Sequence, residues 1–207
     1  SVIGAGSWGT TLAVLLVYNG HTVTLWEYDK DYTKTLSKTR ENKTFLPGVK
    51  LPEEMIITNS LKDAAMDKHM LVIAVPTQFI RSVLKQISGI VSPHSLVVSV
   101  SKGIENKTLA TVSQIIAEEL HTIPKNNIAV LSGPSHAEEV SRRIPTTVVA
   151  ASASKETSAT VQAVFGTSYF RIYSSEDILG VELAGAVKNV IAIGAGIVDG
   201  AGFGDNT

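Results

Sequence analysis

The sequence predicts an α/β fold: a doubly wound, mostly parallel sheet followed by the first long helix of an all-α domain. Two observations support this prediction. Short apolar runs typical of buried strands alternate with amphipathic helical segments as far as Tyr173, which is the rhythm of βαβ units in a parallel sheet. From Ile178 to Val198 the chain is then almost uncharged and too long for a strand, which indicates a long helix.

The first strand ends in a glycine-rich turn that opens a helix. Gly4, Gly6 and Gly9 follow the apolar pair Val2-Ile3 in the pattern GxGxxG, and an apolar helical run continues to Tyr18. In a Rossmann-type turn these glycines allow a tight turn, close approach of the backbone to a pyrophosphate, and close packing of helix on strand. Unpaired N–H groups at the helix N-terminus attract phosphate. We interpret the turn as a dinucleotide site; the alternative is a purely structural βαβ turn.

The second strand ends at an acidic residue that bears on the choice of cofactor. Glu27 lies 21 residues after Gly6, close to the ~20-residue offset at which a carboxylate meets the ribose hydroxyls of NAD. A carboxylate there repels a 2′-phosphate, and no arginine stands beside it in the sequence. We therefore expect NAD, with NADP as the alternative.

The remaining elements continue the alternation. We expect further strands at 55–58, 69–75, 96–101, 128–132, 146–151 and 170–173, and helices at 29–40, 79–87, 108–120 and 155–165, with a short helix from Ser135. The irregular segment 41–54 is long enough to be functional. Ser60 and Ser135 begin capping boxes.

A change of composition at Ser174 marks a domain boundary. We place a dinucleotide-binding domain at 1–174 and the start of a helical substrate domain at 175–207, and we expect Ser174 or Ser175 to cap its long helix. That helix should be buried, yet this chain supplies no partners for it. We therefore expect the helical domain to be incomplete here and the natural protein to continue past Thr207.

Composition excludes several classes of function. The 207 residues are 44% hydrophobic and carry a net charge of −1. The chain therefore has no excess of basic residues that could bind a nucleic-acid backbone. No apolar run reaches the ~20 residues of a membrane span. There is no cysteine, and the four histidines at element ends show no ligand spacing: His21, His69, His94 and His121. We expect a small soluble ligand and no metal.

Ligands of an open parallel sheet bind at the carboxyl ends of its strands, where two residues stand out. Lys102 directly follows an apolar strand and precedes a glycine, so its ammonium could bind a phosphate; the alternative is a surface lysine in a turn. Ser135 could cap its helix or help to hold a phosphate or carboxylate at the same place.

Lys188 interrupts the long apolar helix. Its ammonium could reach solvent while the stem lies on apolar surface, or it could be a desolvated proton donor to a carbonyl group; the residues alone favour neither. Asn189 beside it could orient a substrate hydroxyl.

Together these stretches resemble the NAD(P)-dependent sn-glycerol-3-phosphate dehydrogenases. The resemblance runs through the whole chain in the family's order, in the stretches Gly4-Ala5-Gly6-Ser7-Trp8-Gly9-Thr10, Phe45-Leu46-Pro47-Gly48, Val75-Pro76, Ser101-Lys102-Gly103, Ser132-Gly133-Pro134-Ser135 and Gly185 to Gly196. In that family the second domain is helical and carries a phosphate clamp and further catalytic residues beyond Thr207.

The resemblance assigns roles to individual residues. It implies that the dinucleotide is contacted, beyond the three glycines and Glu27, by Ser7, Trp8, Tyr28, Phe79, Lys102 and Ala137. It also implies that Lys102 binds the substrate phosphate near the nicotinamide, that Gly133 and Ser135 line the substrate side, and that Lys188 is the catalytic proton donor.

The resemblance implies an oxidoreductase that interconverts dihydroxyacetone phosphate and sn-glycerol 3-phosphate by hydride transfer. We expect a cytoplasmic homodimer that supplies glycerol 3-phosphate for glycerolipid synthesis. The alternatives are a related Rossmann dehydrogenase of 3-hydroxy acids or sugar acids, and a non-catalytic NAD-binding module.

Overall fold

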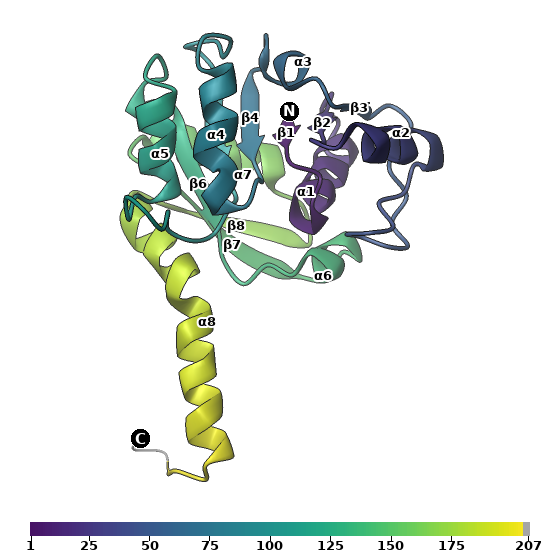
Figure 1. Cartoon of the computed structure of the whole chain (residues 1–207). Coiled ribbons are helices and arrows are strands. Elements are labelled where there is room, and N and C mark those ends of the chain that lie inside the picture. Colours follow the sequence, from purple (N-terminus) through teal and green to yellow (C-terminus); the bar gives the residue numbers. More distant parts are fainter. Residues whose placement is uncertain (205–207) are drawn as a thin grey trace.

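The computed structural model describes residues 1–204 and has the predicted α/β architecture (Figure 1). The end of the predicted second domain, 205–207, lies outside the described residues. One sheet has the strand order β3-β2-β1-β4-β5-β6-β7-β8, whose first six positions follow the order of a doubly wound Rossmann sheet. The last two strands extend it, with β7 antiparallel to β6 and parallel to β8. The strands are β1 (Val2–Ile3), β2 (Thr24–Trp26), β3 (Ile56–Thr58), β4 (Met70–Ile73), β5 (Leu96–Ser99), β6 (Ile128–Ser132), β7 (Thr146–Ser152) and β8 (Phe170–Ser175).

Helices cover both faces of the sheet. The helices are α1 (Ser7–Tyr18), α2 (Lys30–Thr39), α3 (Leu61–Ala65), α4 (Thr77–Ile87), α5 (Val112–Glu119), α6 (Ala137–Ser141), α7 (Lys155–Phe165) and α8 (Ile178–Gly200), with a 3-10 turn η1 (Lys125–Asn127). Successive strand residues point to opposite faces: Val72 packs in the cluster with α1, α6 and α7, whereas Leu71 and Ile73 pack in the cluster with α3, α4 and α5.

The glycine turn joins α1 closely to the sheet. A Cβ on Gly9 would lie 2.0 Å from the carbonyl oxygen of Gly4, and a Cβ on Gly4, whose φ is +117°, would lie 2.7 Å from that of Ala74. A Cβ on Gly6 would meet no atom within 4 Å. Gly4 and Gly9 are thus required by the packing of the protein itself, and Gly6 is not.

Helix α4 begins at Thr77, two residues earlier than predicted, and α5 and α6 begin later than predicted. Helix α5 begins at Val112 rather than Thr108, because Thr111 and Gln114 form a capping box and Leu109 adopts a positive φ of 59°. Helix α6 begins at Ala137, with His136 at its N-cap and no side-chain cap. The predicted cap by Ser135 was therefore wrong; its hydroxyl faces the carbonyl oxygen of Gly133 instead.

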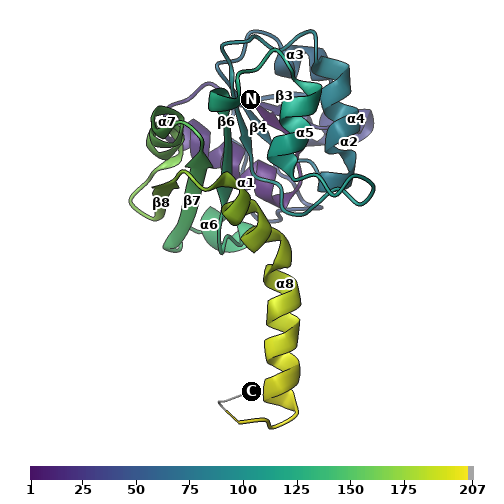
Figure 2. The ribbon, with the colours of Figure 1, turned by 90° about the vertical axis from the view of Figure 1, so that its left-hand side faces the viewer.

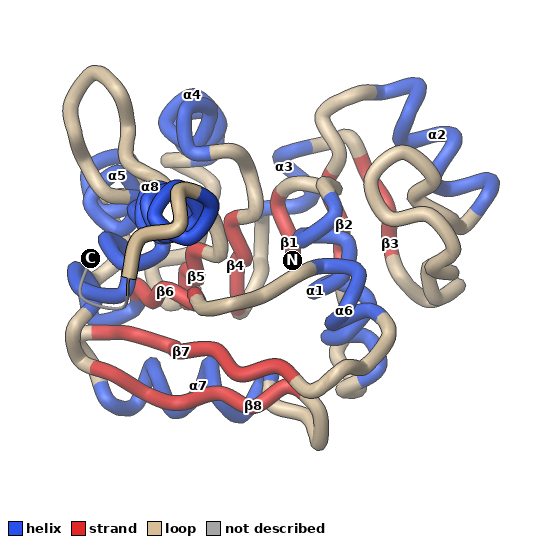
Figure 3. The backbone as a smooth tube through the Cα atoms, turned by 90° about the horizontal axis from the view of Figure 1, so that it is seen from below, coloured by secondary structure: helices blue, strands red, loops and turns tan. Residues whose placement is uncertain are grey.

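Helix α8 runs away from the sheet, so that most of it stands clear of the other elements (Figure 2). Seen nearly end-on in Figure 3, it lies next to α5. The predicted serine caps were wrong, because β8 pairs with β7 as far as Ser175 and Asp177 caps α8 by accepting a bond from the N–H of Gly180.

The predicted burial of α8 was wrong for this chain, since Glu182 is the one buried residue among the described residues of the helix. Over 18 residues the mean hydropathy of α8 is 1.6, so by length and composition alone the helix is apolar enough to cross a membrane. The core helix of a soluble protein passes the same test. An exposed apolar helix instead indicates a surface that needs partners.

The glycines give a paired test of packing. Gly9→Ala should lower the free energy of unfolding by up to about 2 kcal/mol, because the overpacking penalty of about 1–3 kcal/mol exceeds the gain of about 1 kcal/mol in helix propensity. Gly6→Ala, with φ −65° and open space, should change it by less than about 0.5 kcal/mol. Denaturant unfolding of both variants checks this; equal destabilisation would contradict it.

Candidate functional site

The N-terminus of α1 lies at the carboxyl end of β1 and is open to a ligand. Its N-cap is Gly6, no side chain caps it, and its first turn holds no acidic residue. The space beside Gly6, where a Cβ would meet no protein atom within 4 Å, leaves room for a phosphate at the positive end of the helix dipole. Ser7 and Trp8 begin the helix, and the ring of Trp8 lies 6.2 Å from that of Phe170. This turn fits the pyrophosphate of a dinucleotide.

Glu27 ends β2 on the same edge of the sheet. Its side chain is 4% exposed, and its carboxylate accepts a 3.0 Å bond from the N–H of Asp29. Burial raises the pKa of the Glu27 carboxyl group, opposed by the backbone bond from Asp29. Tyr28, the next residue, is exposed. The pair therefore offers a hydrogen-bond acceptor and an open aromatic ring one strand away from the glycine turn.

Asn42, which the sequence analysis missed, holds this turn in place. Its fully buried side-chain amide donates 2.7 Å bonds to the carbonyl of Ala5 and the hydroxyl of Thr10, and its amide oxygen accepts a 2.6 Å bond from Tyr32. The segment 41–54 is thereby attached to the glycine turn. The sequence identified this loop as long enough to be functional, but an asparagine at its start carries no periodic signal.

Lys102 joins two loops at the carboxyl ends of β5 and β6. Its ammonium donates to the carbonyl oxygen of Gly133 at 2.9 Å and to the hydroxyl of Ser135 at 3.3 Å. Burial lowers the pKa of Lys102, and the positive charge of Lys188 lowers it further. The structure thus brings Lys102, Gly133, Ser135 and Lys188 into one neighbourhood.

The first turns of α8 come close to Lys102 and to the end of β6 at Gly185. A Cβ on Gly185 would lie 2.8 Å from the hydroxyl oxygen of Ser132 and 3.7 Å from Cγ of Lys102. Lys188 and Asn189 follow on the next turn and are exposed. Of the two alternatives for Lys188, this chain shows the one in which its ammonium reaches solvent, because apart from these contacts α8 stands free of the sheet.

The last two predicted cofactor contacts lie on opposite sides of the site. Ala137 is buried against α1, where its carbonyl oxygen accepts a 3.2 Å bond from the hydroxyl of Thr11. Phe79, in the first turn of α4, is 62% exposed. Both elements start at the carboxyl edge of the sheet, as the binding of a ligand along that edge requires.

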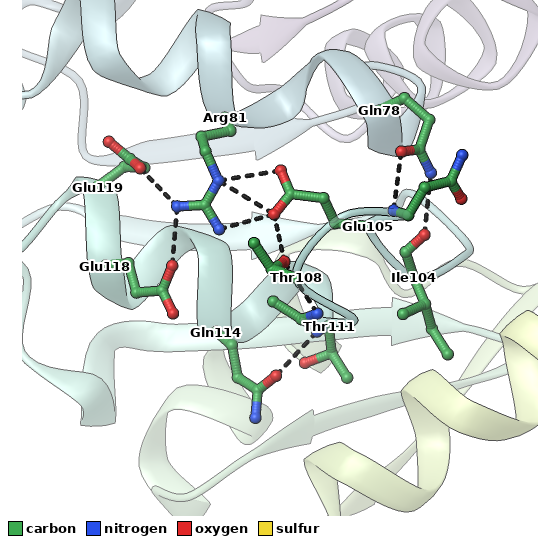
Figure 4. Close-up of polar contacts among 11 residues, drawn as sticks. Gln78, Arg81, Ile104, Glu105, Thr108, Thr111, Gln114, Glu118 and Glu119 are labelled. Carbon is green, nitrogen blue, oxygen red and sulfur yellow. Dashed lines mark hydrogen bonds and ion pairs between the residues drawn. The ribbon is translucent and has the colours of Figure 1, made fainter.

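An ion-pair network fixes the loop that follows Lys102 (Figure 4). The guanidinium of Arg81 on α4 contacts the carboxylates of Glu105, Glu118 and Glu119 at 2.6–2.8 Å. The hydrogen bonds from Arg81, followed by that from Thr108, stabilise the ionised carboxylate of Glu105 and lower the pKa of that carboxyl group to about 2. On the same helix, Thr77 donates a 2.9 Å bond to the carbonyl oxygen of Lys102. The backbone at Lys102 is therefore held from α4.

The proximity of the two ammonium groups can be measured by titration. A neighbouring positive charge disfavours the protonated form, so Lys188→Met should raise the pKa of Lys102 toward its ordinary value of 10.5, though not fully, because burial remains. NMR titration of ¹³C-methylated lysines checks this, with Lys34→Met as the control. An unchanged pKa of Lys102 in Lys188→Met would place the two groups apart.

Two family models match this chain. The family model described as NAD-dependent glycerol-3-phosphate dehydrogenase N-terminus matches residues 1–158, and the model described as the C-terminus of that enzyme matches residues 177–207. The second match includes α8, the apolar helix.

Two curated relatives are named glycerol-3-phosphate dehydrogenase, NAD(P)+. The protein of Fusobacterium nucleatum is 50% identical over 208 residues, and that of Geobacter sp. strain M21 is 51% identical over 207 residues. Each alignment covers 100% of this chain, and the chain spans 62% of the length of each relative.

A solved structure shares the fold. The crystal structure of glycerol-3-phosphate dehydrogenase from Coxiella burnetii aligns with a TM-score of 0.88 at 33% identity, covering 99% of this chain and 62% of that one. The two family models match the chain in order, the first over residues 1–158 and the second over residues 177–207, which include α8. The chain therefore belongs to the NAD-dependent glycerol-3-phosphate dehydrogenase family.

Proposed function

We propose that the protein to which this chain belongs interconverts dihydroxyacetone phosphate and sn-glycerol 3-phosphate with NAD(H). The observation that supports this most directly is the approach of α8 to Lys102 at the carboxyl edge of the sheet, where a Cβ on Gly185, three residues before Lys188, would lie 3.7 Å from Cγ of Lys102. Two ammonium groups close together repel each other, and a bound phosphate dianion would relieve that repulsion. The names of the relatives point to the same substrate.

The cofactor binds along the glycine turn in this proposal. The free N–H groups of α1 hold the pyrophosphate, Glu27 accepts bonds from the ribose hydroxyls, and Ser7, Trp8, Tyr28, Phe79 and Ala137 contact the rest of the dinucleotide. When bound, the dinucleotide supplies or accepts the hydride. Asn42 keeps the turn in its binding conformation through its bonds to Ala5 and Thr10.

The substrate binds on the side of β5 and β6. Lys102 binds its phosphate, Gly133 and Ser135 line the pocket, and Asn189 orients a hydroxyl group. Lys188 stabilises the developing alkoxide and gives it a proton, and in the reverse direction it removes the proton. We further propose domains at 1–174 and 175–207, with the remainder of the helical domain enclosing Lys188, and a cytoplasmic homodimer that supplies glycerol 3-phosphate for glycerolipid synthesis.

The two lysines should differ in their kinetic effects in the full natural protein, including any residues outside this chain. Lys188→Ala should lower kcat for dihydroxyacetone phosphate by roughly 10²-fold or more and leave the Kd for NADH nearly unchanged. Lys102→Ala should act mainly on KM. Lys34→Ala, an exposed lysine, serves as the control. A Lys188→Ala enzyme with near-normal kcat would remove the mechanism.

Glu27 should set the choice of cofactor. NADH should bind at least about tenfold more tightly than NADPH, or about 1.4 kcal/mol, because the buried carboxylate repels the 2′-phosphate. Glu27→Gln should reduce the preference, and the exposed control Asp31→Asn should not. Fluorescence titration at fixed salt measures all three proteins; equal affinities in the unsubstituted protein would refute the prediction.

A further inference from the structure

Helix α8 is attached to the sheet domain by a carboxylate that none of the proposed roles uses. Glu182, in the second turn of the helix, is buried, and its two oxygens accept bonds from Ser113, one from the backbone N–H at 2.8 Å and one from the hydroxyl at 2.6 Å. Among the described residues of α8 it alone is buried. The contact joins residues 69 positions apart in the chain.

The chemistry of the contact between Glu182 and Ser113 makes it strong. Ser113 lies in the first turn of α5, which has no acidic residue of its own, so Glu182 supplies the negative charge that a helix N-terminus attracts. Bonds to an ionised acceptor are roughly twice as strong as neutral ones. A buried carboxylate is costly without such bonds. Any movement of α8 that separates Glu182 from Ser113 is therefore opposed.

The place of Ser113 links this contact to the substrate side. Residues 102–113 form one segment, with Lys102 at its start and Ser113 at its end. The segment is held to α4 by the pair Arg81–Glu105 and by the bond from Gln78 to the carbonyl oxygen of Ile104. Lys102 and the attachment point of α8 thus lie at the two ends of a segment that is held to α4.

Lys188 lies a short distance along the helix from this anchor. It follows Glu182 by six residues, which is about 9 Å of helix axis at ~1.5 Å per residue. Between them, Gly185 faces the end of β6, where a Cβ on this residue would lie 2.8 Å from the hydroxyl oxygen of Ser132. Two contacts at different elements fix both the direction and the rotation of the helix, and so the place at which the Lys188 ammonium emerges.

We propose that Glu182 is a positioning residue, whose bonds to Ser113 set α8 so that Lys188 lies beside Lys102. Its effect on catalysis rests on the proposed function; its effect on the helix does not.

Three variants separate the possible effects. Glu182→Gln removes the charge of the carboxylate but keeps the shape of the side chain. Glu176→Gln, an exposed carboxylate two residues before α8 that pairs with Lys155, is the matched control. Ser113→Ala removes one of the two bonds without touching α8.

Hydrogen exchange on the chain tests the anchor. In Glu182→Gln the amides of Ser113 and of the first turns of α8 should exchange at least about tenfold faster, while those of β4 and β5 keep their protection. Ser113→Ala should show a smaller effect in the same residues, and Glu176→Gln none. Unchanged exchange in Glu182→Gln would overturn the proposal, as would loss of protection throughout the sheet.

Kinetics of the full natural protein test the positioning. Glu182→Gln should lower kcat at least tenfold with the Kd for NADH unchanged, because only Lys188 is displaced; normal kcat despite faster exchange would overturn the proposal. If the unsubstituted protein does not reduce dihydroxyacetone phosphate, the proposed function fails, and titration of Lys102 decides the positioning. A rise in the pKa of Lys102 in Glu182→Gln, as in Lys188→Met, supports the positioning role of Glu182. An unchanged pKa of Lys102 overturns that role.

Discussion

The parallel pairing of the first six strands is the constraint on which the rest of this structure depends. Because β1, β2, β4, β5 and β6 run in the same direction, the residues that follow each of them meet at one edge of the sheet. The glycine turn, Glu27, Lys102 and Ser135 come from four different strand ends, and none is near another in the sequence. A single antiparallel strand among them would send one of these groups to the opposite edge. The antiparallel β7 lies outside this set.

The electrostatics of that edge are uneven. Positive groups gather on it: the N-terminus of α1, the partly buried ammonium of Lys102 and the nearby charge of Lys188. Glu27 lies at the end of β2, which β1 and β4 separate from β5, the strand that Lys102 follows. Such a distribution suits a ligand with phosphates toward the centre and on one side and hydroxyl groups on the other. The cost of keeping Lys102 charged at a partly buried position is reduced by its bonds to Gly133 and Ser135.

Helix α8 shows how little contact is needed to place the side chain of Lys188. Most of its apolar surface is exposed in this chain, yet its first turns are held by one charged pair of bonds at Glu182 and one close backbone approach at Gly185. The glycine matters because any side chain there would strike Ser132. A strong anchor near the base of a helix is sufficient, because the helix itself is stiff over the two turns that separate Glu182 from Lys188.

The sequence by itself determined the order and nature of the elements. Apolar runs and period-3.6 patterns are local, so β6 and α7 were predicted with the observed bounds. The turn between β1 and α1 and the position of Glu27 at the end of β2 were also located from the sequence alone. Tertiary structure decided what joins distant segments. Asn42 on the glycine turn, Arg81 with Glu105, and Glu182 on Ser113 are polar contacts between residues 24 to 69 positions apart, and no periodicity encodes them. Helix caps were also decided by the tertiary structure. Ser135 and Ser175 have side chains that can cap a helix, but Ser175 pairs with β7 as part of β8 and the hydroxyl of Ser135 faces the carbonyl oxygen of Gly133. The assembled fold therefore determines which partner each of these residues has.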